Sequence, residues 1–534
     1  MSFISTLFNS FLFQGKYGFL TRQFYLEDET LFNRVPFTYQ FFPIFITIVL
    51  IFLFTLMIRK DKLFNIVMFV CIALCIAECC ISLKNIINIK KRFNEYSKIV
   101  NDKGKEDTIT PILHLSKTGK NIITIFSDRA PSSFFVRVLD EDDNLKDQFK
   151  GFTYFPNTVS LGAMTIVGVP SMLGGYEYSP YELNKRVSES YLNKYNEANF
   201  VLPRFMLNNN YDVTILDPPL PNLTQKGDLS AYKNEFGNSI TIKELEGKYT
   251  EKYLNEKRLN TKNNSDKVAK KEIQNFVVLE ILYPNMRKWF NAKFRSKYFN
   301  SLENFSSGSL DVDDLTFLDS YSTLYYLNDL TAFDGENDQY IFLGTNITHN
   351  EAYLNASFEQ PTDIDNKVKL KYETGINRID KNYHSYLALM KSLGQFFDEL
   401  RENGVYDNTR IIITSDHGLQ REIPPLDTTQ STFNPILLYK DFNQRDVIKI
   451  DNTFMTSADA PLLAVEGVDN RPINPYTKNR LSGDKSHGIN VYYAHPMDVN
   501  GVPFRDGKKK TLNLSHRGYK VHDDLFNKSN WIKL

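Results

Sequence analysis

Two long apolar runs occupy the start of the chain. No charged residue occurs from position 36 to 58, and residues 63–83 form a second run that only Glu78 interrupts. The hydrocarbon core of a bilayer is about 30 Å thick, and a helix of either run is long enough to cross it. A buried helix of a soluble protein is the alternative for each run. We expect a membrane anchor at residues 1–92 with two spanning helices.

The charges beside these runs indicate which way the chain crosses. The short loop 59–62 carries three positive charges and one negative charge. Short loops of this kind stay on the cytoplasmic side, so two crossings place the rest of the chain outside. The basic residues at 84 and 90–92 oppose this orientation, although large domains cross membranes despite flanking charge. We therefore expect the part after residue 92 to be extracytoplasmic.

Short β-branched and aromatic runs recur after a charged linker at residues 93–118. Runs of this length and composition are typical of buried strands. They lie at 121–127, 201–203, 211–217, 340–345, 409–414 and 433–439. Apolar residues at helical spacing from 387 to 400, followed by Asn403-Gly404, predict a helix that ends before the strand at 409. The pattern predicts an α/β domain over 119–534.

Two of the predicted strands end on residues that can bind a cation. Asp128 follows one run, and Asp416, His417 and Gly418 follow another. Open α/β sheets bind ligands beyond the carboxyl ends of their strands. Asp416 and His417 can converge on one ion only where the backbone turns, and we expect Gly418 to allow this by adopting a positive φ. A polar strand end leading into a surface turn is the alternative.

A threonine stands where a phosphate-binding helix would begin. Thr165 precedes Gly174-Gly175 at a spacing that predicts a helix from the threonine to the glycines. A helix N-terminus offers free N–H groups and a positive dipole end to a phosphate. A threonine at a helix start is more often only a cap, which is the alternative here.

Composition narrows the classes of function. Lys and Arg together number 63, as do Asp and Glu, so no overall positive charge indicates a nucleic-acid partner. All four cysteines lie between positions 71 and 80, which excludes a cysteine-based zinc site or a disulfide in the rest of the chain. The charged segment near 243–299 predicts a helical insertion. No spacing that demands a metal site is found among His487, His495, His516 and His522.

The helix followed by ENGVYDNTRIIITSDHG at 402–418 resembles the C-terminal half of the sulfatase/alkaline phosphatase superfamily. Within it, the chain is most similar to membrane-anchored, lipoteichoic-acid-synthase-like phosphotransferases. The resemblance implies an alkaline-phosphatase-like α/β/α domain with a central mixed, mostly parallel sheet. It also implies a multi-pass protein of a bacterial cell membrane. Sulfatases proper carry Cys or Ser in a Cys/Ser-x-Pro-x-Arg motif, whereas this chain has Thr165 followed by Ile-Val-Gly-Val, which disfavours sulfate-ester hydrolysis by that route.

The resemblance implies roles for the polar residues at the strand ends. Asp128, Asp416 and His417, with Thr165, would bind one divalent metal ion, although the lipoteichoic acid synthases carry Glu where this chain has Asp128. A mostly oxygen ligand set suits Mn²⁺ or Mg²⁺, with Zn²⁺ as a further candidate. A threonine hydroxyl is a weak nucleophile, so the metal ion is expected to activate Thr165.

Two histidines complete the site that the resemblance implies. His349, just beyond the strand at 340–345, would bind the phosphate oxygens or protonate the leaving group, and His384 on the long helix would assist. The reaction would move a phospholipid headgroup, phosphoglycerol or similar, onto a cell-surface glycan or glycolipid. Two alternatives stay open, namely a phosphodiesterase, phosphatase or sulfatase-like hydrolase with water as acceptor, and a non-catalytic surface scaffold.

Overall fold

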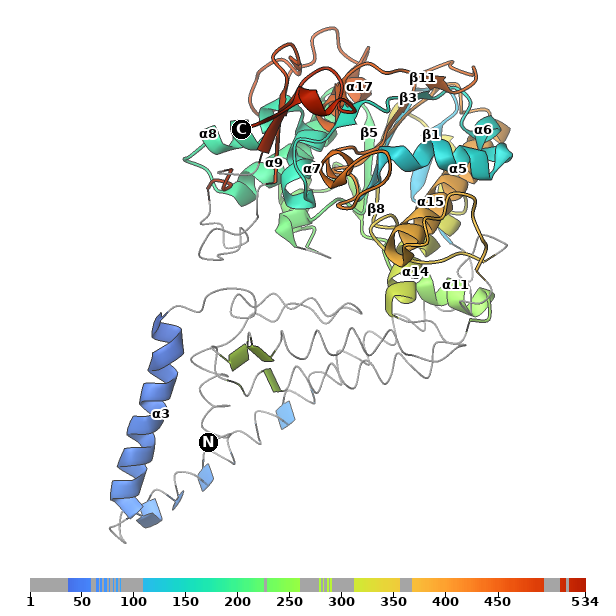
Figure 1. Ribbon diagram of the computed structural model, residues 1–534. Helices are drawn as coiled ribbons and strands as arrows, with labels where there is room; N and C mark the ends of the chain where they lie inside the picture. Colours follow the sequence, from blue (N-terminus) through green and yellow to red (C-terminus); the bar gives the residue numbers. More distant parts are fainter. Residues whose placement is uncertain are drawn as a thin grey trace. The chain divides into compact units, whose positions relative to one another are not determined.

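The structure, a computed structural model, divides into two compact units (Figure 1). It describes residues 37–58, 109–224, 228–259, 312–355, 367–493, 510–514 and 518–534, with short pieces between 64 and 87 and between 278 and 290. The first unit comprises residues 1–18, 26–110 and 272–299. The second comprises residues 19–25, 111–271 and 300–534.

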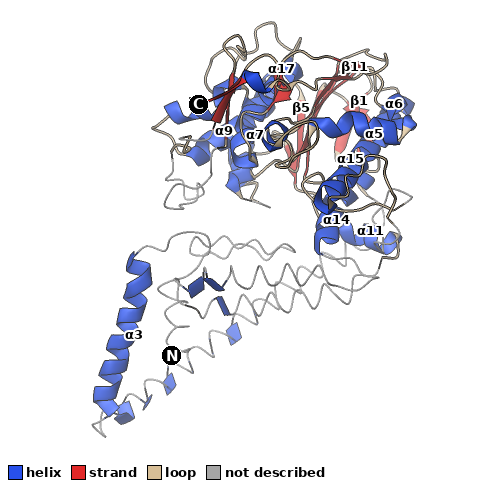
Figure 2. Ribbon diagram, viewed as in Figure 1, coloured by secondary structure: helices blue, strands red, loops and turns tan. Residues whose placement is uncertain are grey.

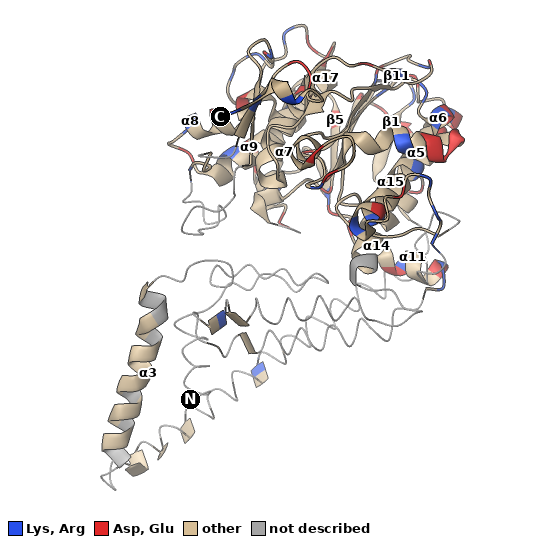
Figure 3. Cartoon of the chain, in the orientation of Figure 1, with Lys and Arg blue, Asp and Glu red and all other residues tan. Residues whose placement is uncertain are grey.

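The first unit contains the helix α3 (Phe37–Ile58), which coincides with the first apolar run (Figure 2). Its 22 residues include no charged one (Figure 3). Even so, within the described ranges no helix is both long enough and apolar enough to cross a membrane. The predicted spans at 36–58 and 63–83 are therefore not supported, and most of the second run lies outside the described residues.

The second unit is built on a mixed, mostly parallel sheet, as predicted. Its eight strands lie in the order β11 (Lys449–Ile450), β3 (Thr153–Tyr154), β10 (Leu437–Lys440), β9 (Thr409–Thr414), β2 (Asn121–Ser127), β8 (Gln339–Thr345), β5 (Asp212–Leu216) and β6 (Thr241–Lys243). The five strands from β9 to β6 are parallel, whereas β10 is antiparallel to β9. The central strands therefore have their carboxyl ends at one edge.

Helices cover both faces of this sheet (Figure 1). On one side lie α7 (Thr165–Gly174), α9 (Tyr191–Asn208) and α17 (Ala460–Val465), and on the other α5 (Phe135–Glu141), α6 (Asp143–Gln148) and α15 (Asn377–Glu402). Every residue of β2 is buried, with Ile122 and Phe126 in the core shared with α7 and α9. A strand that is buried on both faces does not alternate polar and apolar residues, so its β-branched residues form a continuous run in the sequence.

Shorter elements complete the unit. The helices are α8 (Pro180–Lys185), α10 (Ser230–Phe236), α11 (Thr250–Glu256), α14 (Val312–Tyr325) and α16 (Thr428–Thr432). Small sheets pair β1 (Leu113–Ser116) with β7 (Thr331–Gly335), β4 (Thr158–Val159) with β12 (Met455–Thr456), and β13 (Ile489–Tyr492) with β14 (Gly518–Val521) and β15 (Trp531–Lys533). Of the predicted insertion at 243–299, the structure describes the part to residue 259, which contains α11, and a few pieces beyond.

One predicted strand is wrong. Residues 201–203 lie inside α9, although Pro203 removes one helical hydrogen bond there. Val201 and Leu202 are buried in the core, and a short apolar run of this kind fits a buried helix as well as a strand. Packing of the whole apolar face of α9 against the sheet outweighs the local cost of the proline.

Strand register brings distant segments together at the carboxyl edge. Ser127 at the end of β2 is paired with Thr345 of β8, and Phe126 is paired with Thr414 of β9. The residues that follow these three strands are therefore neighbours. Helix α7 closes on the same edge, because Gly168 lies against the backbone of Asp416.

We predict that Gly168→Ala destabilises the fold by about 1–3 kcal/mol, as overpacking does. A Cβ at Gly168 would lie 2.4 Å from the carbonyl oxygen of Asp416, which is backbone and cannot move aside. Without the clash, the higher helix propensity of alanine would stabilise the protein by about 1 kcal/mol. A net loss of stability would therefore show that the clash is the larger effect. Urea unfolding of the purified protein measures the change.

The matched control is Gly394→Ala in α15. Its Cβ would meet the side chain of Gln148, which can move away at the cost of its hydrogen bond to Asp398, so the loss of stability should be smaller than at Gly168. Equal unfolding midpoints for the Gly168 variant and the wild-type protein would contradict the close approach of α7 to β9.

Candidate metal centre and nucleophile

Three predicted metal ligands meet at the carboxyl edge of the sheet. Ligand atoms of Asp128, Asp416 and His417 all lie within 4.8 Å of one another. Asp416 is fully buried, and His417 and Asp128 are nearly so. The Nε2 atom of His417 lies 3.9 Å from Oδ1 of Asp128 and 3.6 Å from Oδ2 of Asp416. Two acids and one imidazole thus face a common point.

Backbone N–H groups bind one of the two carboxylate oxygens of Asp416. Its Oδ1 accepts hydrogen bonds from the N–H of His417 at 2.9 Å and of Arg129 at 3.2 Å. Its Oδ2 is buried and has no hydrogen-bond partner among the described residues. A buried carboxylate oxygen without a partner is costly unless a cation binds it.

The tautomer of His417 suits metal binding. Its Nδ1 lies 2.7 Å from the carbonyl oxygen of Gly418, and a carbonyl only accepts, so Nδ1 carries the proton and donates. Nε2 is therefore the unprotonated nitrogen in the neutral ring. Fixing one ring nitrogen by a backbone carbonyl is how proteins orient a metal-binding imidazole.

The carboxylate of Asp128 is buried beside a second acid. Burial and the carboxylate of Asp416 raise the pKa of Asp128 to about 7, and His417, Arg129 and the hydrogen bond from Thr165 oppose this only in part. Its backbone is fixed: its N–H donates to the carbonyl of Thr345 at 3.0 Å, and its carbonyl accepts from the Thr348 hydroxyl at 2.6 Å. A shift of the main chain at residue 128 therefore cannot move the carboxylate away from its neighbours.

These observations fit a bound divalent cation. The site combines an unpartnered buried oxygen, an unprotonated ring nitrogen and two repelling carboxylates. A cation would neutralise the two acids and keep Asp128 ionised at neutral pH. Oxygen and imidazole ligands of this kind bind Mg²⁺, Mn²⁺ or Zn²⁺.

Thr165 lies beside this centre as the first residue of α7. Its Oγ1 donates to Oδ1 of Asp128 at 3.4 Å. The residue in the cap position is Met164, which forms no side-chain cap, so the Thr165 hydroxyl does not cap the helix. Helix α7 ends at Gly174, and Gly175 has a φ of 84°, in agreement with the predicted boundaries. The hydroxyl is thus free of a structural role at the helix end.

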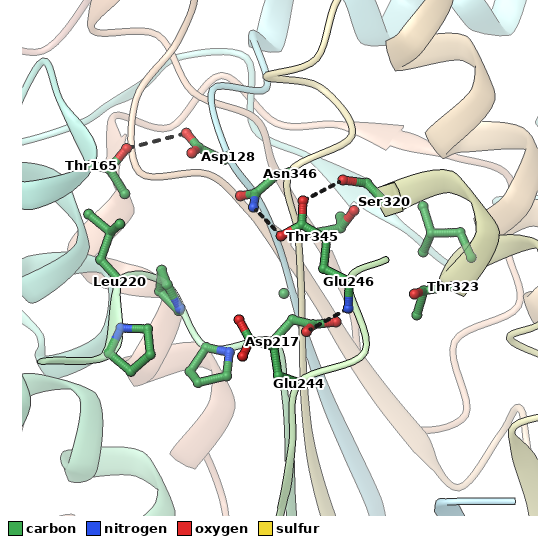
Figure 4. A pocket seen from close by; sticks show the side chains of 15 residues that line it. Asp128, Thr165, Asp217, Leu220, Glu244, Glu246, Ser320, Thr323, Thr345 and Asn346 are labelled. Atoms are coloured by element: carbon green, nitrogen blue, oxygen red, sulfur yellow. Dashed lines mark hydrogen bonds between the residues drawn. The ribbon is translucent and has the colours of Figure 1, made fainter. Parts of the chain in front are cut away.

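A small, acidic cavity is lined by Thr165 and Asp128 among other residues (Figure 4). Its volume is about 50 Å³, and Asp217, Glu244 and Glu246 are among its lining residues. Burial and the charge of Glu246 raise the pKa of Asp217 to about 7. Such a cavity repels a bare anion and suits an alcohol or a cationic group better.

His349 follows β8 at the same edge. Its side chain reaches solvent, yet the surrounding protein and the positive charge of Arg129 lower its pKa, so the ring is mostly neutral at pH 7. The peptide N–H of His349 donates to the carbonyl of Asn346 at 3.0 Å. The structure thus brings His349 to the carboxyl edge, with Arg129 and Asp416 among the charges that act on it.

His384 is not brought to the metal centre. Its ring is fully buried on α15, where Nδ1 accepts from the N–H of Leu354 at 3.2 Å and Nε2 donates to Glu373 at 2.8 Å. Both nitrogens are used inside the protein, so the ring has no free atom for a phosphate oxygen. The expected assisting role of His384 is not supported, because the helical face that carries it points into the core.

Gly418 has a different role from the expected one. It is not among the residues with positive φ, so it does not make the turn by a left-handed conformation. Its Cβ would lie 2.1 Å from the carbonyl oxygen of Ser431, and close approach of two backbones explains the glycine. The left-handed residue is instead Arg129, with a φ of 62°.

Of the late histidines, His487 and His522 lie in described segments and are absent from the metal-ligand group there. His495 and His516 lie outside the described residues. Sequence reasoning also passed over Arg129, Arg421 and Glu351. The one signal for Arg129 was its position directly after Asp128. Its partial burial depends on contacts with segments far away in the chain, such as the bond of its N–H to Asp416.

Comparison with known proteins shows the family to which a chain with this fold and candidate metal centre belongs. The sulfatase family profile matches residues 120–461, more than half of the chain. The chain therefore belongs to the sulfatase family. A relative of known sequence, the uncharacterized sulfatase YdeN of Escherichia coli strain K12, is 24% identical over 161 residues, which cover 26% of this chain and 29% of YdeN.

The chain is also similar to solved structures, at low identity and low TM-score. The lipoteichoic acid synthase LtaP of Listeria monocytogenes is 11% identical, with a TM-score of 0.36 over 76% of this chain and 85% of LtaP. The phosphonate monoester hydrolase SpPMH of Silicibacter pomeroyi is 13% identical, with a TM-score of 0.40 over 76% of this chain and 85% of its own. The phosphoethanolamine transferase EptA of Neisseria meningitidis is 10% identical, with a TM-score of 0.34 over 70% of this chain and 61% of EptA.

We predict that the purified full-length protein binds one divalent ion in its second unit, and that the Asp416→Asn variant binds much less of this ion. Asparagine keeps the Oδ1 acceptor that holds the loop but removes the charge at the unpartnered oxygen. Metal content after dialysis measures this. Without metal, the variant should be at least as stable as the wild-type protein, because one of two like charges is gone.

Asp469→Asn is the control, since Asp469 is an exposed aspartate whose Oδ1 accepts only the N–H of Arg471. Its metal content should equal that of the wild-type protein. Equal content in all three proteins would refute the assignment of Asp416.

Proposed function

We propose that this chain is a metal-dependent phosphotransferase in which Thr165 is the nucleophile. The observation that carries the proposal is the Thr165 hydroxyl: it begins a helix without capping it and lies 3.4 Å from a metal-ligand candidate. Hydrolysis with formylglycine needs Cys or Ser at such a position, and this chain has neither there. A threonine hydroxyl can instead form and break a phosphoester.

The proposed reaction has two steps on one residue. Oγ1 of Thr165 attacks the phosphorus of a phosphodiester, its proton passes to a base, and the first alcohol leaves with a proton. A second hydroxyl then attacks the same phosphorus, and Thr165 regains its proton as it leaves. A divalent ion, when bound, supplies positive charge that favours ionisation of a nearby hydroxyl. His349, mostly neutral at pH 7, is proposed to donate an N–H hydrogen bond to a phosphate oxygen. Its alternative role, protonating the first leaving alcohol, would use the charged imidazolium form, which the lowered pKa makes the minor one at pH 7.

The N-terminus of α7 supports binding of the phosphoryl group. The first N–H groups of a helix have no helical partner and form an anion site together with the positive dipole end. Helix α7 has 10 residues, which is long enough to place a positive dipole end at Thr165. The nucleophile and the anion site are thus parts of the same helical turn.

We propose a phospholipid as donor and a cell-surface glycan or glycolipid as acceptor, on a bacterial membrane with the second unit extracytoplasmic. Support comes from the two apolar runs in the sequence and the positive loop between them. The acidic cavity beside Thr165 fits the alcohol side of the reaction better than the anionic side. Water as acceptor would make the same site a phosphodiesterase.

We predict that Thr165→Ala abolishes turnover of a phosphodiester reporter, by about 10³-fold or more, while the fold stays intact. The variant removes the only atom that forms the covalent bond, and no cap is lost, so stability should change by less than about 1 kcal/mol. Thr428→Ala is the matched control because Thr428 is an exposed threonine that begins α16. Wild-type rates in the Thr165 variant would end the proposal. Product analysis with a glycan acceptor present separates transfer from hydrolysis.

We predict that protease added to intact cells, or to spheroplasts where an outer membrane intervenes, degrades residues 100–534 and spares a cytosolic control. The positive loop at 59–62 is expected on the cytoplasmic side, which leaves the larger part outside. Protection of this part until the membrane is lysed would reverse the orientation. The proposal of a surface acceptor would then fall as well.

A further inference from the structure

A wide groove of the second unit includes Tyr176, which follows the C-terminal end of α7, whereas Thr165 begins that helix. The volume of the groove is about 560 Å³. Sites that hold small organic ligands have roughly 300–1,000 Å³. Residues of α8, β13, β14 and the neighbouring segments line the groove, and none of the three metal-ligand candidates is among them. The groove is therefore distinct from the metal centre.

Hydrogen bonds between polar side chains fix the walls of the groove. Both carboxylate oxygens of Glu177 are occupied, because Asn479 donates to Oε1 and Thr477 donates to Oε2 at 2.7 Å. The hydroxyl of Tyr176 donates to Oδ1 of Asp459 at 2.8 Å, which fixes the position of its ring. Few side chains would have to be ordered when a ligand enters, and this favours binding.

Tyrosine rings form part of the groove surface. Tyr181 on α8 is 50% exposed, and the ammonium group of Lys185 lies 4.5 Å from the centre of its ring. Tyr176 and Tyr492 also line the groove. A tyrosine offers an apolar ring face together with a polar tip. Sugars have the complementary structure, with apolar C–H groups on the ring faces and hydroxyl groups at the rim.

One acceptor in the groove lining has no donor. Oδ1 of Asn490 on β13 is buried and accepts no hydrogen bond among the described residues. The side chain of Asn490 forms a hydrogen bond with Tyr492, which leaves Oδ1 unused. A buried acceptor without a donor is costly. A ligand hydroxyl that enters beside Asn490 can supply the missing donor.

The charges of the groove disfavour an ionic ligand. Among its Asp, Glu, Lys and Arg residues, three are acidic and three are basic, namely Glu177, Glu182, Asp484, Lys185, Arg186 and Lys520. Lys185 pairs with Glu182 at 2.8 Å, and Arg186 pairs with Glu197 at 2.8 Å. A polyanion finds no surplus of positive charge in such a groove. A neutral ligand that is rich in hydroxyl groups fits better.

Backbone hydrogen bonds connect the groove to the segment before the nucleophile. The N–H of Tyr492 donates to the carbonyl of Leu161 at 3.1 Å, and the N–H of Ala163 donates to the carbonyl of Tyr492 at 3.2 Å. Leu161 lines the groove and precedes Thr165 by four positions. Their Cα atoms are therefore at most about 14 Å apart. A chain of a few sugar units spans such a distance.

We propose that this groove binds a neutral stretch of the acceptor glycan, away from the metal centre. The inference rests on the proposed phosphotransferase function and assigns a holding site for its acceptor. Tyr181 stacks on a sugar face, and Asn490 accepts a hydrogen bond from a sugar hydroxyl. A glycan that is held here has a raised local concentration beside Thr165, so a weak acceptor hydroxyl is supplied efficiently.

The test uses the full-length protein and a panel of neutral oligosaccharides of glucose, galactose, mannose or N-acetylglucosamine, with dissociation constants measured by titration calorimetry. At least one of them should bind. Tyr181→Ala should weaken this binding by about tenfold, whereas Tyr181→Phe keeps the ring and should change the constant by less than about twofold. Phe526→Ala is the control, because Phe526 is 44% exposed and is not a groove residue.

The dissociation constant of Phe526→Ala should equal that of the wild-type protein. Failure of every sugar of the panel to bind at millimolar concentration would overturn the inference. Equal constants for Tyr181→Ala and the wild-type protein would do so as well. Tighter binding of a sulfated form of the same oligosaccharide would also contradict it, because a groove without surplus positive charge should not prefer an anion.

Thr165→Ala separates this inference from the proposed function. Thr165 is not a groove residue, so the variant should bind the oligosaccharide with the wild-type constant. Sugar binding that Tyr181→Ala weakens, in a protein without phosphodiester turnover, would remove the phosphotransferase and leave the glycan site. Transfer to the glycan with the same acceptor KM in Tyr181→Ala and the wild-type protein would remove the glycan site and leave the phosphotransferase.

Discussion

The interaction on which the site depends is the repulsion of two buried carboxylates. Asp128 and Asp416 end neighbouring parallel strands, and the register of β2 and β9 leaves them no freedom to separate. In water such a pair would ionise without difficulty, but burial raises the pKa of Asp128 to about 7. A divalent cation relieves this cost, so metal binding and the stability of the carboxyl edge are coupled.

Close packing connects the metal-binding edge to the nucleophile. Helix α7 lies so near the end of β9 that only glycine fits at position 168, and this contact holds Thr165 beside Asp128. Glycine at 418 likewise allows the metal-binding loop to lie on the segment around Ser431. The hydroxyl, the acids and the imidazole are therefore positioned by backbone contacts, which tolerate less movement than side-chain contacts do.

The sequence by itself determined the strands β2, β8 and β9, the extent of α7 and the C-terminal end of α15. These features follow from local patterns, since apolar periodicity and glycine positions report on neighbouring residues. The grouping of Asp128, Thr165, Asp416 and His417 in one site follows from the family resemblance, and the structure places them at one edge of the sheet. The tertiary structure alone decided which atoms lack partners. It buried His384 against Glu373, placed residues 201–203 in a helix, and set the left-handed turn at Arg129 rather than Gly418. Each of these outcomes depends on contacts between segments that only strand register and helix packing bring together.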